Sequence, residues 1–142
     1  MTNSLLKTKK LSAVIALALA SSATQAADLG VANNFSAFVF DDFKSNIGRA
    51  DGAIAAGKID IKGYSVGFLR PSSPNEYYLI SESSIDYKIG RQFVGSMVAG
   101  GGTDVSWSVQ WGMERNSKIT SNQNESAMPF DFDKQEQYYK DL

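Results

Sequence analysis

A six-residue block occurs twice in this chain, as Gly52–Gly57 (GAIAAG) and as Gly95–Gly100 (GSMVAG), with starting points 43 positions apart. The similarity continues downstream, because residues 60–66 (DIKGYSV) correspond to residues 104–109 (DVSWSV). Small and β-branched residues between glycines, repeated at a fixed spacing, are typical of β-rungs stacked on one another. The sequence therefore predicts a mainly β chain with a right-handed β-helix or β-solenoid architecture.

The region from Gly52 to Gly67 gives the clearest strand pattern. Alternation of apolar and charged side chains predicts that one set points inward and the other outward. The inward set is Ile54, Ile59, Ile61 and Val66, and the outward set is Lys58, Asp60 and Lys62. Residues 77–80 and 85–90 resume strand character, and the second copy is expected to continue as strand through Trp107 and Trp111.

Other segments are less regular. Residues 31–43 fit either a helical stripe or a strand, and the run Phe38–Phe40 favours strand, followed by turns at Asp41–Asp42 and Ser45–Gly48. Residues 68–75, with two prolines among serines, and the polar residues 113–127 are expected to be loops.

A helix is expected from Pro129 to the end of the chain. Phe132, Gln135, Tyr139 and Leu142 fall near one helical face. Asp131 and Asp133 fall in the first turn, where the helix dipole favours acidic side chains. Because the chain ends inside this helix, we expect the domain to be truncated at its C-terminal end.

The first 26 residues have the pattern of a secretory signal peptide. Three lysines precede the apolar run Leu11–Ala20, and the small residues Ser21–Ala26 follow it. The apolar run is too short to span a bilayer, which takes roughly 20 residues. We therefore expect a signal at residues 1–26, a secreted or cell-surface domain at residues 27–142, and no membrane span in the mature chain.

Composition excludes several function classes. The chain contains no histidine and no cysteine, which removes catalytic triads and dyads based on them, thiol redox chemistry and structural zinc. Without the three lysines of the signal, 11 basic residues face 15 acidic ones, so a nucleic-acid partner is not expected. No cofactor, metal site or catalytic residue is predicted.

Four aromatic residues are the candidate binding residues: Tyr77, Tyr78, Trp107 and Trp111. Two tryptophans four positions apart can form a platform for sugar rings, but on a strand such a pair more often fills the core. The acidic pairs Asp41/Asp42 and Asp131/Asp133 suggest calcium or acid–base chemistry, yet a solvated turn and a helix start account for them with fewer assumptions.

The order of these segments resembles that of the choice-of-anchor A domain family. The matching segments are residues 34–43 (phenylalanine-rich, ending in acids), 51–57 (glycine block), 64–67 (YSVG), 98–101 (second glycine block) and 131–132 (DF). The likeness covers most of residues 29–142, although Arg49–Gly52 departs from the family's acidic-glycine-arginine order.

This resemblance implies a bacterial, surface-displayed adhesive β-solenoid without catalytic residues. The predicted function is therefore non-enzymatic binding to a matrix protein, a polysaccharide or another cell surface. A carbohydrate-active β-helix, either lyase or hydrolase, is the alternative, and it needs two carboxylates at a defined separation. Ice binding is a further alternative, but the mature chain has only Thr103 and Thr120 for a threonine-ranked face.

Overall fold

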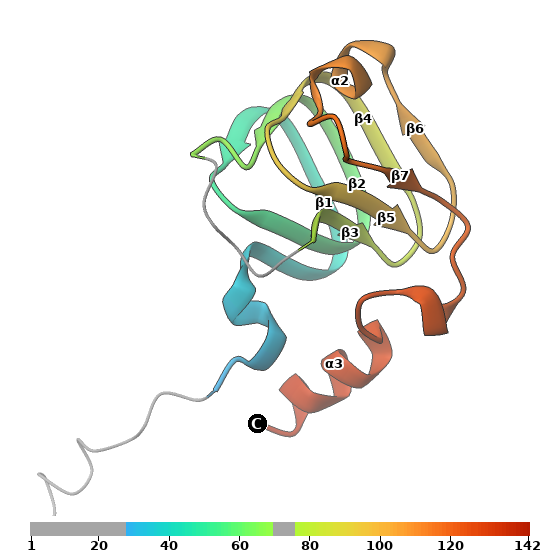
Figure 1. Ribbon diagram of the computed structural model, residues 1–142. Coiled ribbons are helices and arrows are strands. Elements are labelled where there is room, and N and C mark those ends of the chain that lie inside the picture. The colour runs from blue at the N-terminus through green and yellow to red at the C-terminus, as the bar shows by residue number, and fades with distance from the viewer. Residues whose placement is uncertain (1–27, 70–75) are drawn as a thin grey trace, which may run out of the picture.

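The computed structural model describes residues 28–69 and 76–142. The proposed signal segment and residues 70–75 of the predicted Phe68–Asn75 loop lie outside them. In chain order (Figure 1) the elements are η1 (Gly30–Asn34), β1 (Phe35–Ala50), β2 (Ala53–Val66), β3 (Tyr77–Ser81), β4 (Ile85–Gln92), β5 (Ser96–Ala99), β6 (Thr103–Val105), α2 (Trp107–Gly112), β7 (Ile119–Thr120), η2 (Glu125–Ala127) and α3 (Phe132–Lys140).

All strand pairs among these elements are parallel. The long strand β2 pairs along its whole length with β1, through its first half with β3, and through its second half with β4. The next turn adds β5 to β3 and β6 to β4, and β7 then pairs with β5. The result is a mainly β fold with a nearly closed, barrel-like parallel sheet (Figure 1).

The two glycine blocks lie in register but are not neighbours. Ile54 of the first block pairs with Leu79 of β3, and Leu79 pairs with Met97 of the second block. A rung without the glycine signature therefore separates the two copies. The downstream match also holds, since Asp60 pairs with Asp86, and Asp86 pairs with Asp104.

The interior of the sheet is the principal core. The four residues predicted to point inward from β2 (Ile54, Ile59, Ile61 and Val66) are fully buried, whereas Lys58 and Lys62 are exposed. Full burial of one such side chain contributes about 1.5–3 kcal/mol. The structure thus confirms both the strand predicted for residues 52–67 and the side of the sheet to which its apolar side chains point.

Strand β1 confirms the strand interpretation of Phe38–Phe40 and corrects the predicted turns. Asp41–Asp42 and Ser45–Gly48 lie within β1. A register shift between Val39 and Asp42 and a positive φ of 60° at Ile47 bend the strand without ending it. Turn-forming residues are therefore used here for a bulge and a corner inside one long strand.

A second apolar cluster lies on the outer side of the sheet. Ala55, Ile80 and Val98 occupy one register position on successive strands, and Phe132 packs against them. The predicted C-terminal helix is confirmed as α3, where the Asp131 side chain accepts a hydrogen bond from the backbone N–H of Lys134 (3.0 Å). Helix α3 and the segment before it therefore cover this side of the sheet (Figure 1).

The strand predicted through Trp107 and Trp111 is wrong, because these residues form α2. Ser106 is extended (φ −60°, ψ 147°), and helical backbone begins at the next residue. The alternation of Trp107, Val109 and Trp111 places all three on one face of a strand, whereas a helix puts Val109 on the side opposite the tryptophans. Val109 is the buried residue of α2 and anchors it to the end of the sheet.

Candidate functional site

The four predicted binding residues form two separate pairs. Tyr77 is half-buried against the outer apolar cluster, and Tyr78 is only 3% exposed. The Tyr78 ring lies so close to Gly95 that a Cβ there would stand 2.4 Å from it. Both tyrosines thus serve packing around β3, and Tyr78 offers no surface to a ligand.

Trp107 and Trp111, in contrast, are 76% and 84% exposed. They are four residues apart on one helical turn, so their indoles project from the same side of α2. Large apolar side chains left in water are informative because burial of such groups is the main driving force of folding. This pair is the strongest candidate for a binding site.

A row of exposed isoleucines leads along the corner of the sheet to α2. Ile47 (φ 60°) and Ile89 (φ 55°) have left-handed backbone, and Gly63 (φ 62°) occupies the equivalent position between them. The N–H of Ile89 donates a hydrogen bond to Ser106 Oγ (3.3 Å), immediately before Trp107. Left-handed backbone costs an L-residue about 1–2 kcal/mol, and a β-branched side chain is among the least suited to it.

Two arginines form a second row beside the isoleucines. Arg49 and Arg91 both pair with Ser65, one from each side. The Arg49 guanidinium lies 4.4 Å from the centre of the Phe68 ring, and that of Arg91 lies 4.7 Å from the centre of the Phe93 ring. The two phenylalanine rings contact each other edge to face at 5.5 Å, so they join the two arginines into one cluster.

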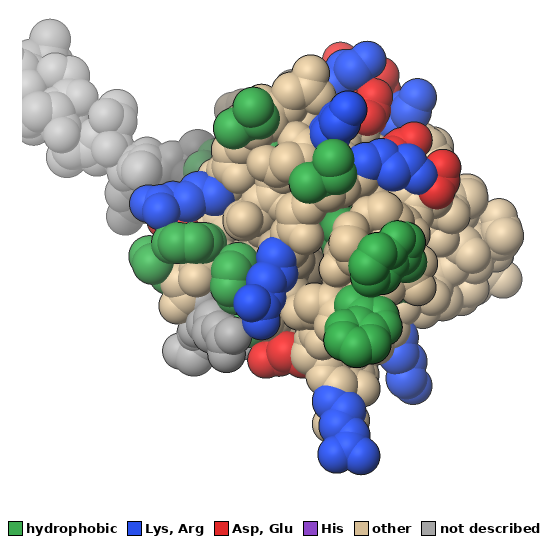
Figure 2. All heavy atoms as spheres, turned by 90° about the horizontal axis from the view of Figure 1, so that it is seen from above, with side chains coloured by type: hydrophobic (Ala, Val, Ile, Leu, Met, Phe, Trp, Pro, Cys, Tyr) green, Lys and Arg blue, Asp and Glu red, His purple; other side chains and the backbone are tan. Residues whose placement is uncertain are grey.

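The arginine row continues to the tryptophan helix. A Cβ at Gly112 would lie 3.3 Å from Cγ of Arg91, which places the C-terminal end of α2 directly against this arginine. We call the combined surface the aromatic–arginine end; it consists of Ile47, Arg49, Phe68, Ile89, Arg91, Phe93, Trp107 and Trp111. Figure 2 shows hydrophobic side chains interspersed with basic ones on the face of the molecule where α2 lies.

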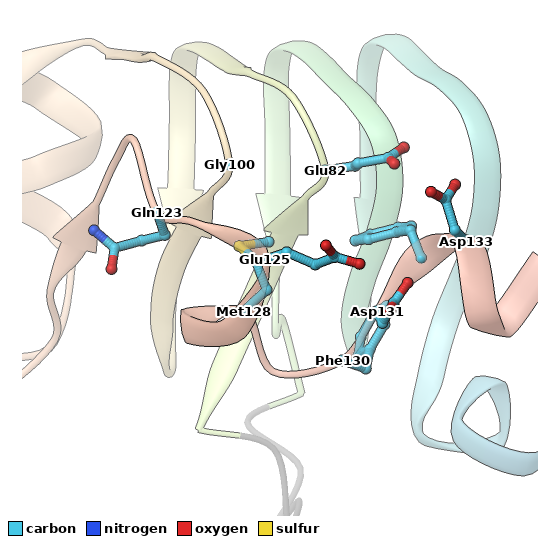
Figure 3. Close-up of a pocket in the computed structure, with 9 residues that line it drawn as sticks. Glu82, Gly100, Gln123, Glu125, Met128, Phe130, Asp131 and Asp133 are labelled. Carbon is cyan, nitrogen blue, oxygen red and sulfur yellow. The ribbon is translucent and has the colours of Figure 1, made fainter.

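An acidic cavity of about 270 Å³ lies between the sheet and the segment that leads into α3. Figure 3 shows the Glu125 side chain pointing toward Asp131, and the Asp133 side chain pointing toward Glu82. Partial burial, together with the charges of Asp133 and Glu136, raises the pKa of Glu82. The hydrogen bond between Glu125 and Asp131 raises the pKa of Glu125, while the backbone N–H of Lys134 lowers that of Asp131.

The Glu125–Asp131 pair does not have the spacing of a glycosidase carboxyl pair. A hydrogen-bonded carboxyl pair is about 3 Å apart, whereas retaining enzymes separate their carboxyl groups by about 5–5.5 Å and inverting enzymes by more. Asp131 is also occupied, because its Oδ1 accepts from the Lys134 N–H and its Oδ2 pairs with Lys134 Nζ at 3.2 Å. The helix-start interpretation of Asp131 is confirmed.

A ladder of charges covers a further face of the sheet. Asp60, Asp86 and Asp104 occupy one register position on three neighbouring strands, and Lys44 precedes them on β1. Lys44 pairs with Asp60 (3.4 Å), and Lys88 contacts both Asp86 and Asp104. The hydrogen bond from Lys88 to Asp104 raises the pKa of Lys88. The two lysines therefore neutralise part of the charge of the three aspartates.

Residues 28–69 and 76–142 contain no cluster of three or more acidic side chains suited to a metal ion. Asp41 and Asp42, the other acidic pair singled out by the sequence, are exposed on β1. Within the same residues no helix is both long and apolar enough to cross a bilayer.

Comparison with known protein families assigns the chain to one of them. The profile of the family described as "Putative Ice-binding-like adhesive domain" matches residues 28–142. The chain belongs to this family. The expectation of an adhesive-domain family is thereby confirmed, while the narrower assignment to choice-of-anchor A domains stays a prediction. No curated protein and no solved structure matches the chain significantly.

Sequence reasoning found the tryptophans but missed the rest of the aromatic–arginine end. A signal for it exists in a second, shorter repeat: Ile47-Gly48-Arg49 recurs as Ile89-Gly90-Arg91. The structure places the two tripeptides at the same register on strands β1 and β4, with β2 between them. This exact tripeptide repeat is therefore the sequence signal that marks the corner of the sheet where the two arginines lie.

Proposed function

We propose that this protein is an exported, non-enzymatic adhesive domain that binds its ligand through the aromatic–arginine end. The observation that carries the proposal is the exposure of Trp107 and Trp111 on one side of a helical turn. Tryptophan is strongly enriched among the residues that dominate binding energy, because it buries a large area at a small entropic cost. Membership of an adhesive-domain family supports the same role.

The test is a retention assay of the full chain on immobilised matrix proteins and on neutral and acidic polysaccharides. Replacement of both tryptophans by alanine should reduce retention at least tenfold, because each truncation at a binding hot spot costs about 2 kcal/mol or more. Leu142→Ala is the matched control, since Leu142 is 62% exposed and lies near the C-terminal end of α3, away from α2 in Figure 1. Undiminished retention of the tryptophan double variant would refute the proposal.

Ice binding is the second candidate, because the family is described as ice-binding-like. Ice-binding faces are expected to present ranks of threonines, and Thr103 and Thr120 lie on different strands, β6 and β7. The charge ladder of β1, β2, β4 and β6 is also unlike a flat, uncharged face. A thermal-hysteresis measurement on the full chain decides the matter, and we expect no hysteresis.

Three finer points belong to the same proposal. We expect the coil to be right-handed, because crossover connections between parallel strands are right-handed in about 98% of cases. We expect residues 1–26 to direct export, and the domain to be of the choice-of-anchor A type. Fractionation of cells that produce the full chain, followed by intact-mass measurement, should find the protein outside the cytoplasm and shortened by the 26-residue signal.

A further inference from the structure

We propose that the ligand of the aromatic–arginine end is an acidic polysaccharide, a polymer of sugar rings that bear carboxylates. This inference rests on the proposed adhesive function and adds the chemical class of the ligand. It starts from the repeated tripeptide, Ile47-Gly48-Arg49 and Ile89-Gly90-Arg91, which the fold stacks at one corner.

The fold explains the glycines of this repeat but not the isoleucines or arginines. A Cβ at Gly48 would lie 2.8 Å from the Tyr64 ring, and one at Gly90 would lie 2.0 Å from the Tyr64 carbonyl oxygen. Glycine is therefore required on both sides of Tyr64. Ile47 and Ile89 are 86% and 59% exposed on unfavourable backbone, so packing gives no reason to repeat them.

The arginines of the repeat are held ready for an anion. Arg91 makes no ion pair with any acidic side chain in the described part of the chain, and Arg49 reaches only Asp51, at 4.0 Å. Each guanidinium carbon lies over a phenylalanine ring, a cation–π contact that restrains the arginine side chain without using a carboxylate. A planar guanidinium binds a carboxylate through two parallel hydrogen bonds, and stacking on an aromatic ring is compatible with that contact.

The spacing between the two arginines suits a polymer that carries several negative charges. Arg49 and Arg91 are separated by two strand spacings, which is about 10 Å. An extended chain of sugar acids presents carboxylates at regular intervals along one side and the apolar C–H faces of its rings between them. The carboxylates would reach the arginines, while the ring faces would lie on Trp107, Trp111 and the exposed isoleucines.

The experiment compares two polymers with the same sugar backbone, one bearing carboxylates and the other bearing uncharged methyl esters in their place. The full chain is titrated with polygalacturonate and with its fully methyl-esterified form, and tryptophan fluorescence is followed. The chain contains only two tryptophans, and both lie on α2, so the signal reports this surface alone. We expect polygalacturonate to bind at least tenfold more tightly than the ester, to protect the tryptophans from acrylamide quenching, and to bind more weakly as ionic strength rises.

Variants then assign the charge effect to the arginine row. Arg91→Gln should weaken polygalacturonate binding about tenfold, and Arg91→Lys should weaken it several-fold because the bidentate fork is lost. Lys58→Gln removes the same charge from an exposed position on β2, on the charged face, and should change affinity less than twofold. Urea unfolding of each variant checks that the fold is retained, and the wild-type comparison of the two polymers needs no variant.

Each outcome has a distinct meaning. Equal binding of the two polymers, or equal loss in Arg91→Gln and Lys58→Gln, overturns the acidic-polysaccharide assignment. Tryptophan-dependent binding to a neutral glycan or a matrix protein, without binding to polygalacturonate, also overturns it but leaves the adhesive function standing. Absence of binding to every surface in the retention assay removes both.

Discussion

Replacing Ile47 by asparagine should make the protein more stable, although it removes an apolar side chain from a strand. The Ile47 backbone is left-handed, with a φ of 60°, and its side chain is 86% exposed. Relief of the backbone strain is worth about 1–2 kcal/mol, since asparagine tolerates this conformation. The burial that is lost is a small fraction of the roughly 1.5–3 kcal/mol for a fully buried isoleucine. The net gain should be about 1 kcal/mol.

The measurement is urea unfolding of the wild type and the variant, with free energies compared at a common slope. A gain of about 1 kcal/mol corresponds to a melting temperature higher by about 3–6 °C for a domain of this size. Ile47→Val is the matched control, because it keeps the β-branched side chain and hence the strain, and it should change stability by less than about 0.5 kcal/mol. If Ile47→Asn proves less stable than the wild type, the strain argument is wrong.

Two further predictions concern other parts of the sheet. Gly57→Ala should destabilise the fold by about 2–3 kcal/mol, because the new Cβ would stand 2.2 Å from the Phe40 carbonyl oxygen. Gly102→Ala should be neutral or slightly stabilising, because no atom lies within 4 Å of the position of its Cβ. Chemical unfolding of both variants measures the two changes in stability. Stability should rise as pH falls through the raised pKa of Glu82 toward its ordinary value of 4.5, because the folded state takes up the proton first. Glu82→Gln should be more stable than the wild type at neutral pH, and its stability should rise less as the pH falls, because only the raised pKa of Glu125 still contributes. Equal dependence of stability on pH in the variant and the wild type would contradict this.

The stacked strands could be predicted because their signals are local. In β2, charged and apolar residues alternate with the period of a strand, and only glycine fits at position 57, because the Phe40 backbone approaches it closely. The repeat of the glycine block predicted stacked strands, and the structure places the two blocks in register. The rung between them did not follow from the sequence, because β3 carries the same apolar positions (Leu79 and Ile80) without the glycines that mark the repeat.

The loop expected over residues 113–127 is wrong in part, because it contains β7 and η2. Two other errors share one physical cause, which is that short-range patterns are ambiguous at corners. Asp41–Asp42 and Ser45–Gly48 carry turn chemistry, yet the neighbouring strand β2 pairs with β1 on both sides of the bulge and of the corner at Ile47, so the chain continues as one strand. Trp107 to Trp111 alternates like a strand, yet β6 is only three residues long and no strand among residues 28–69 and 76–142 pairs with this segment. Tertiary pairing, not local propensity, decided both cases.

The aromatic–arginine end differs from two other faces of the sheet, one whose apolar side chains are covered and one whose charged side chains form ion pairs. Ala55, Ile80 and Val98 would form an exposed apolar stripe, but Phe132 and its neighbours cover it. The lysines of the ladder compensate most of the charge of its aspartates. At the remaining corner Ile47 and Ile89 have strained backbone, and the indoles of Trp107 and Trp111 are exposed. None of the described residues covers these indoles. Since folding alone would favour glycine or asparagine at Ile47, a gain in stability accompanied by a loss of ligand retention in Ile47→Asn would show that this corner is kept for binding.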